Sequence, residues 1–170
     1  VLDPNSGDFL STPINAKEDK QSINLTLDHQ LNKHVTLSAS YSHMKDKWKS
    51  KDGWTLGPES GWDPDDINTS INHLRPQNHY ALNVSYENAR FYTGLLLNYY
   101  TGCSGLAFTD NRFLILDWNA NYEFANGITA YVTVGNLTNE SYETSYNSWN
   151  GIGSSAMPGR YFMVGTKYKF

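Results

Sequence analysis

The sequence predicts an all-β fold, an antiparallel transmembrane β-barrel segment of about seven long strands. First, apolar and polar residues alternate over stretches close to the ~9–11 residues that a tilted strand needs to cross a bilayer. Second, long loops and short turns alternate along the chain, as they do in outer-membrane barrels. Third, the 170 residues include 12 Tyr, 5 Trp and 7 Phe, and many of these aromatic residues fall near strand ends on the apolar face, where membrane barrels carry aromatic girdles.

The first two expected strands form a hairpin. Residues 22–28 alternate between isoleucine or leucine and polar residues, and residues 35–42 alternate between apolar residues and Ser or Thr. A short turn at 32–34 separates them. Period-2 alternation of this kind gives each strand one apolar and one polar face.

The remaining expected strands repeat the same pattern after a long loop at 45–77. A turn near 87–89 joins the next pair, and Asn126-Gly127 marks a later hairpin, because Asn-Gly is the strongest short hairpin signal. Loops are expected at 101–112 and 139–159. The apolar-face positions of these strands lie within 80–86, 91–99, 114–122, 130–134 and 162–170.

Residues 1–21 are polar and irregular and are expected to form an extracellular loop or lead-in, with residues 22–170 forming the barrel portion. Seven strands leave two open edges, and lipid cannot satisfy exposed backbone groups. The chain is therefore expected to be part of a larger barrel. The other strands would lie in a longer chain or on a second chain.

Composition excludes several other classes of protein. No apolar run approaches the ~18 residues of a membrane-spanning helix, and a net charge of −4 argues against a general nucleic-acid binder. The single cysteine excludes a disulfide framework. We expect no metal, because Asp63, Asp65 and Asp66 lack the EF-hand spacing; a calcium site of another kind stays open. We expect no cofactor and no enzymatic activity, because Gly-x-Ser-x-Gly is absent and no His neighbours Cys103 in sequence.

The final segment resembles the C-terminus of TonB-dependent outer-membrane receptors, and the resemblance covers roughly residues 15–170. The similar residues are Asn136-Leu137 followed by polar residues and Tyr142, then Pro158-Gly159-Arg160, then a last strand ending in Phe170. Segments 75–80 and 116–124 also fit. The resemblance implies a 22-stranded barrel and a plug domain that is absent from this sequence. It also implies that Tyr168 and Phe170 match the signal read by the barrel-assembly machinery.

The resemblance further implies a location in the bacterial outer membrane and transport of a ferric siderophore, haem or cobalamin, driven by the TonB complex through the plug. Aromatic residues that could stack on such a ligand, or pack within their own loops, are Trp54, Trp62, Tyr146 and Trp149. Lys47 and Lys49 could attract an anionic chelate, bind lipopolysaccharide phosphates, or solvate a loop. The predicted membrane girdle consists of Tyr41, Tyr80, Tyr86, Phe91, Tyr99, Tyr122 and Phe162.

One different class remains open. A soluble β-sandwich also alternates apolar and polar residues, because its apolar face packs on a second sheet. In that case Trp54, Trp62 and Trp149 would serve as platforms for a carbohydrate.

Overall fold

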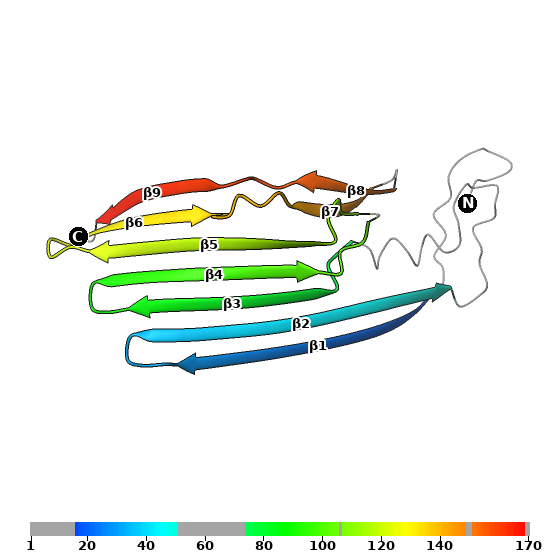
Figure 1. Ribbon diagram of the computed structural model, residues 1–170, viewed down its shortest axis with the longest axis horizontal. Coiled ribbons are helices and arrows are strands. Elements are labelled where there is room, and N and C mark those ends of the chain that lie inside the picture. The colour runs from blue at the N-terminus through cyan, green and yellow to red at the C-terminus, as the bar shows by residue number, and fades with distance from the viewer. Residues whose placement is uncertain (1–15, 51–73, 106, 149–150, 169–170) are drawn as a thin grey trace.

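A computed structural model describes residues 16–50, 74–105, 107–148 and 151–168. Seven of its strands form one antiparallel sheet in the order β1-β2-β3-β4-β5-β6-β9, and two form a separate hairpin (Figure 1). This confirms the predicted all-β barrel segment. The strands are β1 Ala16–Gln30, β2 Val35–Ser50, β3 Asn78–Glu87, β4 Phe91–Thr101, β5 Arg112–Glu123, β6 Ile128–Gly135, β7 Glu143–Ser148, β8 Gly151–Ala156 and β9 Tyr161–Tyr168.

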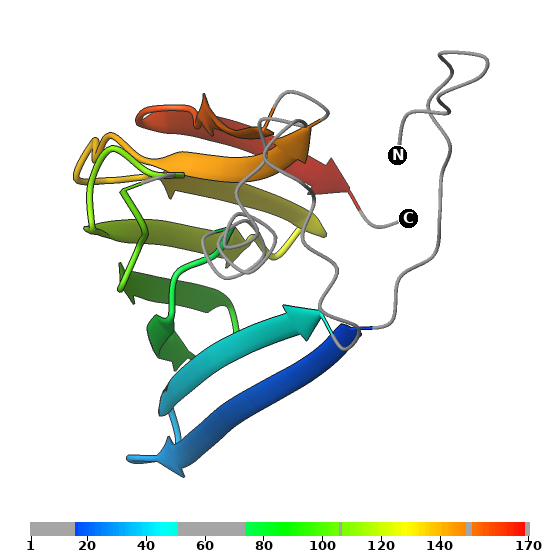
Figure 2. The same cartoon turned by 90° about the vertical axis from the view of Figure 1, so that its right-hand side faces the viewer.

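The large sheet is curved like a section of a barrel wall and does not close (Figure 2). Within the described part of the chain, β1 and β9 are its two edge strands. Short turns join β1 to β2, β3 to β4 and β5 to β6 at one end of the sheet, and the longer connections gather at the other end (Figure 1). We call these the short-turn end and the long-loop end.

The register brings apolar positions together across all seven strands. Leu82 on β3 lies opposite Ala39 on β2 and Leu97 on β4, and the row continues to Leu116 on β5. Because side chains alternate between faces, these residues share one face of the sheet. That face is open: Leu25 is 60% exposed and Leu82 is 36% exposed. No helix among the described residues is long and apolar enough to cross a membrane.

The opposite face is largely polar. Ser40 lies opposite Ala81, and Ala81 lies opposite Asn98, which gives polar or small residues at the level where the other face carries leucines. In a soluble sandwich a second sheet would cover the apolar face. Among the described residues, the other sheet is the two-stranded β7–β8 hairpin, and it leaves that face exposed.

The first hairpin is longer than the alternation predicts. Strand β1 begins at Ala16, whereas the expected strand began at Ser22, and β2 continues to Ser50 beyond the expected end near residue 44. The added residues are charged and show no apolar period. In register, Lys20 faces Asp46 and Asp19 faces Lys47, whereas Lys17 faces Lys49.

The predicted loop at 139–159 also contains regular structure. Strands β7 and β8 form an antiparallel hairpin in which Tyr146 lies opposite Gly153. The tyrosine ring occupies the space where a Cβ at Gly153 would lie. Small residues in β8 and the absence of an apolar alternation hide this hairpin from pattern analysis.

A buried asparagine connects β5, β6 and the segment before β9. Asn136 is 2% exposed and adopts a left-handed backbone with φ of 51°. Its side chain donates to the backbone oxygens of Glu140 at 2.8 Å and Pro158 at 3.4 Å, and it accepts from the Glu140 N–H at 2.8 Å. Its own N–H donates to Asp117 Oδ1 at 2.8 Å. This network fixes the turn after β6, where the Asn-Leu pair stands.

Candidate functional site

The candidate site lies on the largely polar face at the long-loop end, where four rings stack in a row. His79 stacks on Tyr100 at a centroid distance of 4.3 Å, Tyr100 on Phe113 at 4.8 Å, and Phe113 on Tyr142 at 5.7 Å. The register explains the row, because His79 faces Tyr100 and Tyr100 faces Phe113 across neighbouring strands. Offset and stacked rings at these separations attract one another. We call this set the ring row.

The ring row ends at His79. The residue paired with His79 on the other side is Ser42, whose side chain is small and carries no ring. The Nε2 atom of His79 lies 2.9 Å from Asn98 Oδ1, which fixes the orientation of the imidazole. The row of stacked rings therefore does not continue onto β2 at this position.

A small apolar core supports the ring row from the loop that follows β4. Cys103, Ala107, Phe108 and Phe113 are all buried. Burial raises the pKa of the Cys103 thiol to about 11, so this thiol is protonated at neutral pH and is a poor nucleophile. The loop thus contributes packing at this end of the sheet.

A carboxylate ties the same loop to the β7–β8 hairpin. Glu143 accepts hydrogen bonds from the N–H and the hydroxyl of Thr109, each at 2.8 Å. These two bonds to Thr109 lower the pKa of Glu143 because they stabilise its ionised form. A pocket of about 80 Å³ lies between the loop and the hairpin and is lined by Phe108, Phe113 and Tyr142 among others. It is smaller than the ~300–1,000 Å³ of typical ligand pockets.

Acidification is expected to release this tie. The contribution of Glu143 is fully present above its unfolded pKa and is lost as the pH falls through its lowered folded pKa. Hydrogen exchange of the Thr109 amide should therefore show protection at pH 7 that drops at pH 3. In Glu143→Gln the protection should be low at both pH values. Glu87→Gln, at the short-turn end, should behave as the unmodified protein does, and equal protection in Glu143→Gln would contradict the assignment.

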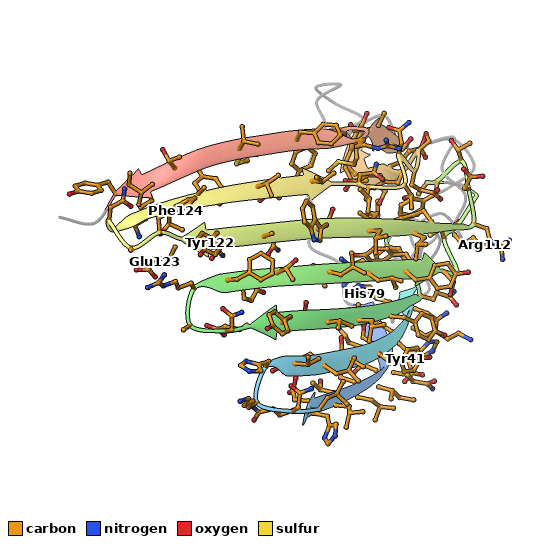
Figure 3. All side chains as sticks on the ribbon, turned by 60° about the vertical axis from the view of Figure 1, so that its left-hand side comes forward. Tyr41, His79, Arg112, Tyr122, Glu123 and Phe124 are labelled. Carbon is orange, nitrogen blue, oxygen red and sulfur yellow. The ribbon has the colours of Figure 1, made fainter. Side chains whose placement is uncertain are left out.

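The predicted girdle residues occupy two levels of the apolar face. At the long-loop end Tyr80 lies between Tyr41 and Tyr99. Its ring centroid is 4.8 Å from that of Tyr41 and 6.0 Å from that of Tyr99. At the short-turn end Tyr86 and Phe91 lie 6.2 Å apart, and Tyr122 faces Phe91 in register. Figure 3 labels Tyr41 and Tyr122 at opposite ends of the sheet. Phe162 lies on the edge strand β9 opposite Val134 and is 69% exposed.

The two levels lie within the height of a membrane's apolar band. Tyr80 and Tyr86 are six residues apart, about 20 Å along the strand at ~3.3 Å per residue and roughly 15 Å along the membrane normal at a tilt of ~40°. Outer-membrane barrels carry an apolar band ~25 Å tall. Beyond the Tyr41 level the same face becomes polar. Asn78 contacts the Tyr41 hydroxyl at 3.0 Å, His43 Nδ1 at 2.8 Å and Thr101 Oγ1 at 3.2 Å. A membrane role for these rings stays a prediction.

The other predicted site residues are only partly placed. Trp54, Trp62, Trp149 and Phe170 lie outside the described residues. Lys47 and Lys49 belong to the extended part of β2. Tyr146 is 49% exposed on β7, and Tyr168 is 55% exposed on β9 opposite Ile128. The structure does not bring Tyr146 into the ring row. Three of the rings in that row, Tyr100, Phe113 and Tyr142, were not among the predicted ligand contacts.

Among the described residues, no group of three or more His, Cys, Asp or Glu side chains lies close enough together to hold a metal ion. The described sheet has one apolar and one polar face, it carries two aromatic levels, and its short turns lie at one end. Together these features are typical of a barrel wall. The comparison with solved structures agrees with this class.

A chain in the solved structure of the FpvAI–pyocin S2 complex superposes on this chain with a TM-score of 0.64 and 16% sequence identity. The match covers 91% of this chain and 20% of that one, so the sequence spans about a fifth of the length of the chain it matches. The likeness shows a shared fold, that of a curved antiparallel sheet forming part of a barrel. No protein-family model and no curated protein matches the sequence.

Proposed function

We propose that this chain forms part of the wall and of the external ligand surface of a TonB-dependent receptor in the bacterial outer membrane. The observation that carries the proposal is the exposed apolar face, continuous in register over seven strands and bounded by two aromatic levels. Water disfavours such a face by roughly 25 cal/mol per Å², whereas lipid accommodates it. The proposal assigns transport to the protein and no chemical step.

The proposed cargo is a ferric siderophore or a similar nutrient such as haem or cobalamin, taken up with energy delivered by the TonB complex through a plug domain. The ring row supports this cargo class, because it offers a stacking surface on the largely polar face at the long-loop end. The proposed cellular partners are outer-membrane lipid, the barrel-assembly machinery through Tyr168 and Phe170, and the remaining barrel strands.

The proposal is tested by locating the protein and titrating ligands. Purified outer membranes should contain it as a heat-modifiable band, and ferric chelates should quench its tryptophan fluorescence. His79→Ala should weaken binding about tenfold, the equivalent of ~1.4 kcal/mol for one lost stacking contact. His34→Ala is the matched control, since this ring contacts Tyr86 at the short-turn end and should leave binding unchanged. Recovery as a soluble monomer would overturn the proposal.

A further inference from the structure

The last strand of the large sheet carries a sequence pattern that its neighbour repeats. Each of the two strands contains a tyrosine followed four residues later by a glycine: Tyr131 and Gly135 on β6, Tyr161 and Gly165 on β9. The strands are antiparallel and lie side by side (Figure 1). In register Tyr131 faces Gly165 and Tyr161 faces Gly135, so the pattern is complementary to itself.

Each tyrosine ring lies over the glycine that it faces. A Cβ at Gly165 would meet the ring of Tyr131, and a Cβ at Gly135 would meet the ring of Tyr161. The exposures agree, because Gly165 is partly covered while every other residue of β9 is exposed, and Gly135 is buried. A strand glycine has no side chain, so another group can approach its backbone closely. The two contacts therefore depend on glycine at these positions.

The apolar pattern of β6 and β9 does not select this register by itself. Val132 faces Val164 and Val134 faces Phe162 on the apolar face. A slip by two residues keeps each side chain on its own face and would still give Val134 an apolar partner, Val164. The connection between the strands also leaves room for a slip, because it spans residues 136–160, whereas a short hairpin fixes the register through its turn.

Hydrogen bonds outside the strands hold only the start of β9. Asn136 donates to the Pro158 oxygen at 3.4 Å, and Asn139 accepts from the Arg160 N–H at 2.9 Å. Both bonds hold residues that precede β9. Gly165 lies five residues beyond Arg160, about 16 Å at ~3.3 Å per residue. The register in the middle of β9 therefore depends on its contacts with β6.

A slip by two residues would break both tyrosine–glycine contacts. Tyr131 would face Met163 or Lys167 in place of Gly165, depending on the direction of the slip. Its ring would then meet a long side chain where it now meets bare backbone. Gly135 would likewise lose the ring that covers it. The two pairs thus separate registers that the apolar pattern does not separate.

We infer that the two reciprocal tyrosine–glycine pairs set the register of the last strand on β6. Aromatic rings that cover glycines of a neighbouring strand pin the register of β-sheets. The other edge of β9 has no partner strand among the described residues. In the proposed barrel, the strand that completes the wall would therefore meet a fixed row of N–H and C=O groups on β9. That use rests on the proposed function, whereas the register inference rests on the contacts.

The test measures the register by disulfide cross-linking of the full chain in the Cys103→Ala background. Val132→Cys with Val164→Cys joins residues that face one another. Val132→Cys with Thr166→Cys, or with Phe162→Cys, reports a slip by two residues in either direction. Disulfides need Cα atoms within ~7 Å, and diagonal neighbours lie ~7–8 Å apart, so each pair reports mainly one register. After oxidation with copper phenanthroline, non-reducing gels give the ratio of slipped to native cross-link.

Tyr131→Ala should raise this ratio about fivefold, the upper range for one cross-strand pair. Tyr131→Phe keeps the ring and should leave the ratio unchanged. Tyr131→Gly combined with Gly165→Tyr restores a pair with its partners reversed, and the Tyr161–Gly135 pair shows that the sheet accommodates that orientation. The combined variant should therefore return the ratio to that of the unmodified protein.

Gly153→Ala is the matched control. It disturbs the Tyr146–Gly153 contact of the β7–β8 hairpin, whose strands are separated by two positions, so that its turn fixes its register. The ratio for β6 and β9 should not change, and an equal rise there would overturn the inference. If Tyr131→Ala fails to fold, Gly165→Ala, which displaces the ring with one methyl group, should show the same rise.

An unchanged ratio in both Tyr131→Ala and Gly165→Ala would overturn the inference. So would a combined variant that slips as much as Tyr131→Ala does. The failure of this inference is distinguishable from the failure of the proposed function. An outer-membrane protein without this dependence on tyrosine and glycine refutes only the register inference, whereas a soluble monomer that keeps the dependence refutes only the proposed function.

Discussion

Leu82→Arg is expected to destabilise the folded protein in lipid by about 2–4 kcal/mol, the cost of an arginine near the midplane on the lipid face of a barrel. Leu82 lies near the middle of β3, between the two aromatic levels, and belongs to the exposed apolar row. The measurement is the free energy of unfolding in urea with the protein inserted in vesicles.

The control is the next residue along the same strand. Asn83 faces Ser38 and Leu96 on the opposite side of the sheet, so Asn83→Arg would point its charge into a wet lumen and should change stability little. A surface leucine of a water-soluble protein tolerates arginine to within about 0.5 kcal/mol. Equal costs for the two variants would therefore contradict a lipid-facing row.

Asn136→Ala is expected to cost about 3 kcal/mol. It leaves the N–H and oxygen of Glu140 without their partners, at ~1–3 kcal/mol for each buried polar group left unpaired. It also places a residue with a Cβ at a positive φ without the local hydrogen bonds that an asparagine side chain makes. The same urea titration measures this loss.

Two variants separate the loss of the side-chain hydrogen bonds from the cost of the left-handed backbone. Asn136→Gly keeps the left-handed backbone at no steric cost and should remain strongly destabilised, because the side-chain bonds are lost. Asn139 has a similar backbone, with φ of 57°. Asn139→Gly loses one hydrogen bond, which the Asn139 side chain accepts from the Arg160 N–H. Since Asn139 is exposed, its replacement should cost less than ~1 kcal/mol. A mild effect at Asn136 would show that the buried network is dispensable.

The alternation predicted the sheet because successive side chains of a strand point to opposite faces, so a strand with one apolar face repeats every two residues. Leu82, Val84 and Leu95 could be assigned to one face from the sequence, and the register confirms that they share it. The charged extension was missed because its residues alternate in charge and carry no apolar period. Its residues face partners on a different strand, as Lys20 faces Asp46, and the hydropathy of a single strand does not reveal such partners.

The candidate site was harder to predict. The sequence pattern led us to predict ligand contacts mainly at tryptophans in loops. The rings that the structure brings together are instead His79, Tyr100, Phe113 and Tyr142. A signal existed, since Tyr100 and Phe113 are aromatic residues on a largely polar face. Their stacking depends on the register between β3, β4 and β5 and on the loop that buries Phe113, and neither is specified by single-strand periodicity.

The most direct test of a sheet with one face in lipid and one in water is a cysteine scan of β3. Cys103 is the single cysteine of the chain and is buried, so Cys103→Ala provides a cysteine-free background. Single cysteines at positions 81 to 85 then carry a nitroxide label in vesicles, and collisions with oxygen and with a water-soluble nickel complex are compared. Oxygen should dominate at 82 and 84 and nickel at 81, 83 and 85; equal access at all five positions, or the reversed alternation, would contradict the membrane barrel.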